Sequence, residues 1–162
     1  MAATPDRLSG DLGWGLAVVF RAYVKAADAI AADVPGGNRG YQVLSAAARD
    51  EPGSQAAMAQ RLGIDRTVMT YLLDDLEAAR LVERHPDPVD RRSRRVVATA
   101  HGRAVLAELD ERFAHAESRL LAGLAARDQA EFRRLLREVA ARANELDPLA
   151  TACDAVADLP GR

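Results

Sequence analysis

Arginines concentrate in one short stretch of the chain, between residues 80 and 95. This stretch holds six arginines against three acidic residues, a local net charge of +3, whereas the whole chain carries −2. Guanidinium groups bind phosphate oxygens and are attracted to the negative potential of the DNA minor groove. The overall charge argues against a general nucleic-acid coat, so any contact with nucleic acid must come from this local cluster.

Two short strands are predicted to carry these arginines. Residues 81–85 and the valine-rich 94–99 read as strands, and the turn-forming residues 86–90 join them into a β-hairpin. Arg91 and Arg92 lie at the tip, with Arg84 and Arg94 beside it. Such a ribbon can reach the phosphate backbone and the minor groove, although a solvated charged loop is the alternative.

Just before the hairpin, the sequence predicts two short helices joined by a tight turn. Ser54 can cap a helix that runs to Leu62, Gly63 supplies a left-handed exit, and Asp65 can cap the next helix, over 66–79. This is the pattern of a helix-turn-helix, in which the second helix, called the reader helix below, enters the major groove of DNA. A plain helical hairpin gives the same pattern, and the basic hairpin that follows favours DNA binding.

The residues expected to contact DNA lie at the start of each helix. We expect the following set: Ser54, Gln55, Arg66, Thr67, Met69, Thr70 and Tyr71. The opposite, apolar side is expected to be buried and comprises Met58, Leu62, Ile64, Val68, Leu72 and Leu76. This division predicts which face of the reader helix is free to meet bases.

The remaining sequence predicts a mostly α-helical fold. Only 4% of the residues are aromatic although 49% are hydrophobic, so the core is expected to be filled by aliphatic side chains on helices. Apolar residues recur at helical spacing over 12–33, 39–49 and from 100 onward, and Asp128 with Glu131 predicts a capping-box start for a last long helix. The expected fold is mostly α with a small β-hairpin wing.

Two runs resemble a known family. Asp-Pro-Val-Asp-Arg-Arg-Ser at 87–93 and Thr-Ala-His-Gly-Arg at 99–103 are similar to the wing and wing exit of MarR-family regulators. The resemblance covers about residues 12–146. It implies an N-terminal dimerisation helix over 12–34, a winged helix-turn-helix lobe over 39–99 with the reader helix at 66–79 and the wing at 81–99, and C-terminal dimerisation helices over 100–146. Residues 147–162 form an extension outside it.

The resemblance also implies roles and partners. Asp90 would brace the wing, Arg92 would enter the minor groove and Arg91 would meet phosphate. The partners would be a second copy of the chain and a double-stranded, pseudo-palindromic DNA operator, bound as a ligand-responsive repressor. Two departures bear on DNA affinity: Tyr71 stands where the family often has arginine, with an acidic pair at 74 and 75 after it, and Arg80 occupies the usual glycine position.

The resemblance implies a ligand cleft beside the first two predicted helices. In the family these helices bound a cleft that often takes small aromatic or phenolic ligands, and here they carry Trp14, Tyr23 and Tyr41. Arg21 could pair with a ligand carboxylate. From the residues alone, core packing of the aromatic side chains and a solvent-facing Arg21 are favoured over these ligand roles.

Other functional classes find no support in the sequence. The three histidines, at 85, 101 and 115, lack companions at metal-ligand spacing, so we expect no metal site. No catalytic triad or phosphate-binding glycine loop is present, so we expect neither catalysis nor a cofactor. No apolar stretch reaches membrane-spanning length, and the single Cys153 fits a reducing compartment, so the chain is expected to be cytoplasmic. The rival function is a winged-helix interaction module that no longer binds DNA.

Overall fold

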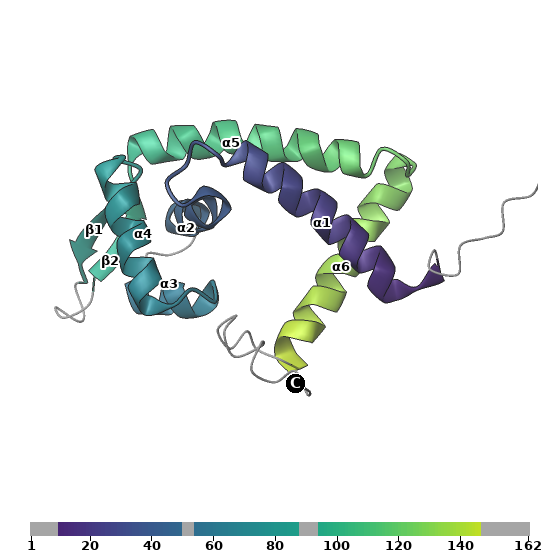
Figure 1. Cartoon of the computed structure of the whole chain (residues 1–162), viewed down its shortest axis with the longest axis horizontal. Helices are drawn as coiled ribbons and strands as arrows, with labels where there is room; N and C mark the ends of the chain where they lie inside the picture. Colours follow the sequence, from purple (N-terminus) through teal and green to yellow (C-terminus); the bar gives the residue numbers. More distant parts are fainter. Residues whose placement is uncertain (1–9, 50–53, 88–93, 147–162) are drawn as a thin grey trace, which may run out of the picture.

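The computed structural model describes residues 10–49, 54–87 and 94–146, which form helices and one hairpin (Figure 1). The elements in chain order are α1 (Leu12–Ile30), α2 (Gly37–Arg49), α3 (Gln55–Arg61), α4 (Arg66–Ala78), β1 (Val82–Pro86), β2 (Arg94–Ala98), α5 (Ala100–Leu120) and α6 (Ala126–Leu146). The predicted mostly α fold with a small hairpin is confirmed. None of the described helices is long and apolar enough to cross a membrane. The 147–162 extension, with Cys153, lies outside the described residues.

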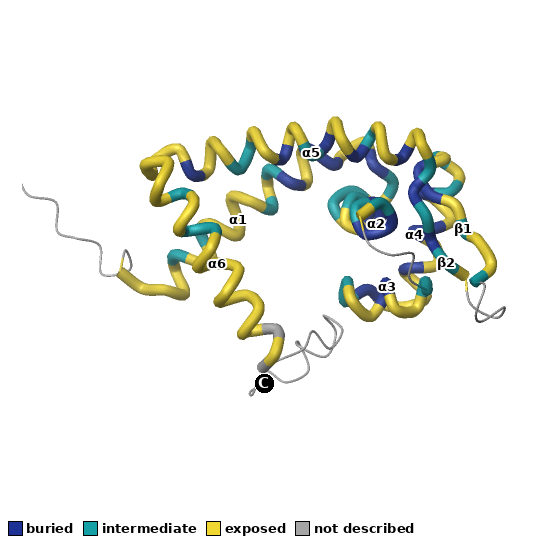
Figure 2. Tube along the Cα trace, turned by 180° about the vertical axis from the view of Figure 1, so that it is seen from behind, coloured by how far each residue is buried: buried dark blue, intermediate teal, exposed yellow. Residues whose placement is uncertain are grey.

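The long helix α5 joins two parts of the molecule (Figure 1). At one end, α2 and β2 pack against it, and together with α3, α4 and β1 they form a compact lobe. Farther along, α1 runs beside α5, and α6 folds back from its end. Burial is concentrated in the lobe and along the inner side of α5, whereas α6 and the N-terminal half of α1 are mostly exposed (Figure 2).

Side-chain caps fix where three helices begin. The Ser54 hydroxyl accepts the N–H of Ala57 at 3.1 Å, and Asp65 accepts the N–H of Thr67 at 2.8 Å. Thr99 caps α5 in the same way, accepting the N–H of Gly102 at 2.9 Å. These bonds satisfy amide groups that have no partner within a first helical turn. The caps expected at Ser54 and Asp65 are therefore confirmed.

The capping-box start expected at Asp128 is wrong. Helix α6 begins two residues earlier, at Ala126, so Asp128 lies within its first turn. Glu131 does not reach back to the helix start, because its carboxylate pairs with Arg134 at 2.7 and 2.9 Å. The salt bridge one turn along the helix replaces the expected cap.

The buried stripe of α4 is rotated from the expected one. Met69, Leu72, Leu73 and Leu76 are buried, and Met69 is fully so. Val68, expected inward, is 42% exposed. Neighbouring residues on a helix point about 100° apart, so a shift of one residue exchanges their environments. The prediction that Val68 is buried is therefore wrong.

A left-handed residue ends α4 and aims the chain into β1. Arg80 has a φ of 59°, and the N–H groups of Arg80 and Leu81 donate to the carbonyls of Glu77 and Leu76, both at 2.9 Å. This is a Schellman ending, which usually has glycine at the left-handed position. Arg80 thus adopts the conformation that its place in the sequence requires, at a steric cost.

The hairpin is antiparallel, and the start of α3 extends it. Val82 pairs with Ala98 and Arg84 with Val96, while Ser54 forms an isolated bridge with Arg95 on β2. At its base the hairpin meets the first turn of α5 at Gly102. A Cβ on Gly102 would lie 2.0 Å from the carbonyl oxygen of Leu81, so only glycine permits this approach.

Candidate nucleic-acid interface

Helices α3 and α4 and strand β2 together line an open hollow of about 330 Å³. Its lining residues are Gln55, Ala56, Ala59, Arg66, Met69, Thr70 and Arg94. The two arginines are exposed, and neither guanidinium pairs with another side chain within residues 10–49, 54–87 and 94–146. Two exposed cations beside one hollow suit a phosphate oxygen, which accepts charge-assisted hydrogen bonds.

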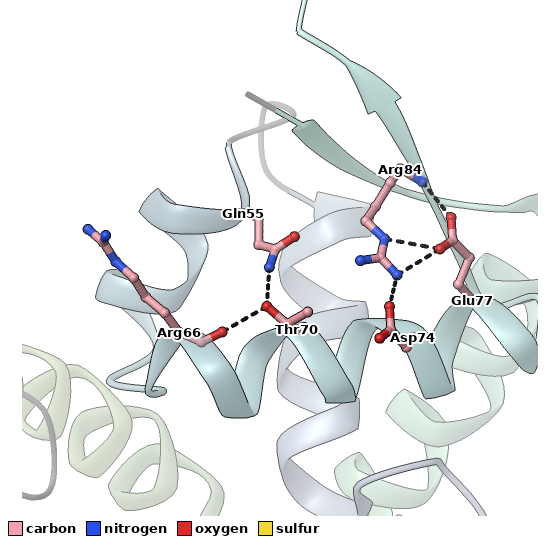
Figure 3. Close-up of polar contacts among 6 residues, drawn as sticks. All are labelled: Gln55, Arg66, Thr70, Asp74, Glu77 and Arg84. Carbon is pink, nitrogen blue, oxygen red and sulfur yellow. Dashed lines mark hydrogen bonds and ion pairs between the residues drawn. The ribbon is translucent and has the colours of Figure 1, made fainter. Parts of the chain in front are cut away.

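Hydrogen bonds link residues that line this hollow (Figure 3). The amide of Gln55 donates to the Thr70 hydroxyl at 2.9 Å, and that hydroxyl donates to the Arg66 carbonyl at 2.9 Å. Thr70 therefore uses its only donor within α4 and links the two helices through Gln55. The bond fixes the position of α4 relative to α3.

The outer face of α4 presents most of the residues expected to read DNA. Arg66, Thr67 and Thr70 are exposed, and Tyr71 is 67% exposed. Met69 is the exception, because it is fully buried in the lobe. The expectation that Met69 contacts DNA is wrong. Val68 lies on the exposed face in its place. Helical spacing fits either residue on the buried stripe, so the sequence holds no signal that separates them.

The helix caps belong to the same face. Ser54 is half-buried, and its hydroxyl is occupied in capping α3. Asp65 caps α4, and its bond from the N–H of Val68 is the largest cause that lowers the pKa of its carboxyl below 3.8. Both caps hold the helix starts near the hollow.

Arg84 was expected to contact DNA, but the structure places it elsewhere (Figure 3). Its side chain is 19% exposed, and its guanidinium pairs with Asp74 and, at 2.8 Å, with Glu77, both on α4. The hydrogen bond with Asp74 is the largest cause that raises the pKa of Arg84. The expected DNA contact is therefore corrected, because the guanidinium already binds two carboxylates. The same ion pair compensates the negative charge of Asp74.

The wing tip lies outside the described residues, and with it Asp90, Arg91 and Arg92. At the end of the described hairpin that is farther from α5, Arg95 pairs with Asp87 at 2.7 Å, and the Asp87 side chain is only 13% exposed. This ion pair braces the hairpin at the point where the tip begins. The sequence indicated a brace at Asp90, and the pair between Asp87 and Arg95 was missed.

Two of the four residues expected to bind a ligand lie together between the lobe and α1. The rings of Tyr23 and Tyr41 lie 6.5 and 4.3 Å from that of Phe113 on α5. Tyr41 donates to Asp110 at 3.1 Å, and the other oxygen of Asp110 pairs with Arg49. Burial is the main cause that raises the pKa of both tyrosines.

The other two expected ligand residues, Trp14 and Arg21, lie exposed on α1. Trp14 precedes Tyr23 by nine residues, roughly 13 Å along a helix. Tyr23 also borders an apolar hollow of about 330 Å³ that α1, α5 and α6 enclose, and neither Trp14 nor Arg21 lines it. Tyr23 and Tyr41 therefore lie on the same phenylalanine ring, and Trp14 and Arg21 lie apart from them.

Many large apolar side chains are exposed on the segments that lie at the end of the molecule away from the lobe, where Figure 2 shows mostly exposed residues. This surface is called the base face here and comprises Leu12, Leu16, Val19 and Phe20 of α1, Leu120 at the end of α5, Leu124 in the turn before α6, and Leu135, Leu136 and Val139 of α6. Phe20 alone is 68% exposed. A patch of this kind on three neighbouring elements usually marks an interaction surface.

A helix-turn-helix followed directly by a basic hairpin defines a winged helix-turn-helix protein. The family model of the MarR family matches residues 39–93, which cover most of α2, the helix-turn-helix and the first strand of the hairpin. The chain belongs to the MarR family.

Solved structures share the fold over most of the chain. CouR from Rhodococcus jostii RHA1, solved with p-coumaroyl-CoA, is 30% identical with a TM-score of 0.67, over 83% of this chain and 95% of that one. The PcaV transcriptional regulator from Streptomyces coelicolor, solved with its natural ligand, is 28% identical with a TM-score of 0.67, over 88% and 99%. A Mycobacterium tuberculosis MarR family protein, solved with p-aminosalicylic acid, is 25% identical with a TM-score of 0.65, over 81% and 99%.

Proposed function

We propose that this chain is a transcriptional repressor that binds a pseudo-palindromic DNA operator as a homodimer and responds to a small ligand. The observation that carries the proposal is the exposed face of α4, where Arg66, Thr67, Thr70 and Tyr71 lie beside Arg94 of the wing. Placing α4 in the major groove brings Arg94 to the phosphate backbone, because the hollow lies between them. No catalytic role is part of the proposal.

The wing tip is proposed to complete the interface. Arg92 enters the minor groove, Arg91 meets phosphate and Asp90 braces the loop. The pair between Asp87 and Arg95 next to the tip supports this arrangement, since it holds the end of the hairpin that carries the tip. Ser54 and Gln55, at the start of α3, are proposed to contribute phosphate contacts next to α4.

The test is the effect of Arg92→Ala on DNA affinity. The probe is a fluorescent duplex from the region upstream of the chain's own gene, followed by anisotropy. Arg142→Ala is the matched control, because it removes the same charge from an exposed arginine on α6, away from the lobe. We expect Arg92→Ala to weaken binding about tenfold and Arg142→Ala to leave it unchanged. Equal affinities for wild type and Arg92→Ala contradict the role of the wing.

Homodimer formation is proposed to cover the base face. Side chains such as Phe20 and Val139 are exposed there on α1 and α6, and burying apolar surface between two copies stabilises a dimer. Two copies joined at this face would present two reader helices to the two half-sites of an operator. Phe20→Glu is expected to give monomers in sedimentation, with Arg103→Glu, on the exposed side of α5, as the control. A dimeric Phe20→Glu protein places the interface elsewhere.

An aromatic or phenolic acid is proposed as the ligand, binding at the aromatic cluster between α1, α2 and α5. Tyr23, Tyr41 and Phe113 supply rings there, and related structures were solved with p-coumaroyl-CoA and p-aminosalicylic acid. Trp14 and Arg21 join the site only if the dimer or the ligand brings them closer. A bound ligand would change the spacing of the two reader helices and so the DNA affinity.

Thermal unfolding tests the ligand proposal directly. p-Coumaric acid and p-aminosalicylic acid should each raise Tm in a concentration-dependent manner, because a ligand that binds only the folded state stabilises it. Benzylamine, an aromatic cation, serves as the control. An unchanged Tm with both acids contradicts an aromatic-acid ligand.

The rival function is a winged-helix module that binds protein in place of DNA. Tyr71 and the acidic residues of α4 favour it. Asp74, however, forms an ion pair with Arg84. Asp75 is the acidic residue of the two that has no ion-pair partner among the described residues. The DNA titration separates the two functions, because an interaction module gives no salt-dependent DNA binding.

A further inference from the structure

One arginine of the wing is bound to the reader helix by four polar contacts (Figure 3). The Nε atom of Arg84 donates to Glu77 at 3.0 Å, and its Nη2 atom pairs with Glu77 and with Asp74. The backbone N–H of Arg84 donates to the other oxygen of Glu77 at 3.0 Å. These three residues, Arg84, Asp74 and Glu77, are called the Arg84 clasp.

The clasp binds Arg84 of β1 through its side chain and through its backbone N–H. Asp74 and Glu77 lie one turn apart on the same face of α4, so a single planar guanidinium can bridge them. The bond to the backbone N–H means that α4 fixes the strand itself. A two-stranded hairpin is marginally stable alone, so contacts of this kind determine where it lies.

Resting on the proposed DNA-binding function, we propose that Arg84 is a positioning residue: the clasp fixes the wing relative to the reader helix, so that both engage one DNA duplex together. The chain thereby keeps two carboxylates on its reader helix. Carboxylates near phosphate disfavour DNA binding, and their presence here is explained by the orientation they impose on the hairpin. Arg84 itself does not contact the duplex.

Whether one substitution strengthens or weakens DNA binding tests this role. Glu77→Gln removes a negative charge, which favours DNA binding by charge alone, but it also breaks the clasp. Asp75→Asn is the matched control, since it makes the same charge change on an exposed residue of the same helix outside the clasp. We expect Glu77→Gln to weaken binding about fivefold, while Asp75→Asn binds as wild type or tighter.

The measurement uses the full chain and the fluorescent duplex from the region upstream of its gene, well below Tm, with the active fraction determined by titration. Arg84→Lys is included, because lysine keeps the charge but lacks the planar fork. Positioning predicts that Arg84→Lys also weakens binding, whereas a phosphate contact would survive the change. Lower affinity in both Glu77→Gln and Arg84→Lys supports the proposal.

Three outcomes overturn it. Glu77→Gln that binds more tightly, as Asp75→Asn does, means that charge alone decides. Glu77→Gln with a lower Tm but wild-type affinity means that the clasp only stabilises the fold. Wild-type protein that fails to bind the duplex contradicts the proposed function and the positioning role together, which separates that failure from one confined to the clasp variants.

Discussion

Gly102→Ala is expected to destabilise the protein where the wing meets α5. The added Cβ would lie 2.0 Å from the carbonyl oxygen of Leu81 and 3.1 Å from a methyl carbon of Leu44. The Leu81 carbonyl cannot easily move, because it accepts the N–H of Thr99 at 3.1 Å. Relieving the overlap therefore requires α5 and the hairpin to separate by about 1 Å or more.

The expected size follows from two opposing effects. Overpacking against backbone costs about 3 kcal/mol, and the better helix propensity of alanine offsets up to about 1 kcal/mol. The net loss of about 2 kcal/mol corresponds to a drop in Tm of roughly 4–8 °C for a chain of this size. Urea and thermal unfolding measure both quantities.

Gly123→Ala is the matched control, because the site has open space and lies outside the left-handed region. Alanine there should leave the stability unchanged or raise it by about 0.5 kcal/mol, since it restricts the unfolded chain. A Gly102→Ala protein as stable as wild type would refute the close approach of α5 to the hairpin.

Three further changes test local features of the fold. Asp65 has a lowered pKa, so the stability that its ionised cap provides is present above pH 3.8 and is lost as the pH falls through the lowered value. The Tm difference between wild type and Asp65→Ala should therefore vanish in acid. A Tm difference that stays constant contradicts the cap. Tyr41 has a raised pKa, so its contribution to stability is complete below pH 10.0 and is lost as the pH rises through the raised value. The unfolding free energy of Tyr41→Phe should therefore fall less steeply at alkaline pH than that of wild type. An equally steep fall shows that Tyr41 does not cause it. Arg80→Gly should stabilise the protein by about 1 kcal/mol in urea unfolding, because glycine adopts the left-handed conformation without steric cost, and destabilisation would show that the Arg80 side chain matters more.

Local signals in the sequence predicted most of the fold. Cap residues such as Ser54 and Asp65 mark helix starts because their side chains bond the next few amides, and the structure has these bonds. The start of α6 was misplaced because Glu131 has a competing partner in Arg134. A cap pattern states what a side chain can reach, and it does not exclude a second partner.

Two features of the candidate site could not be predicted from the sequence: the buried face of α4 and the partners of Arg84. Val68 and Met69 are adjacent apolar residues, and either can be placed on a buried stripe, so the packing of the whole lobe decides between them. Arg84 lies in a basic run and was therefore expected on DNA. Its actual partners, Asp74 and Glu77, are ten and seven residues away across a turn, and the left-handed ending of α4 brings them together.

The central claim is tested most directly by the salt dependence of DNA binding. Wild-type protein is titrated into the labelled upstream duplex over a series of salt concentrations, and the logarithm of affinity is plotted against that of salt. We expect a steep linear fall, with a slope of about −0.9 for each phosphate contacted, and two chains bound to each operator. Absence of binding, or an affinity that does not change with salt, would contradict the account.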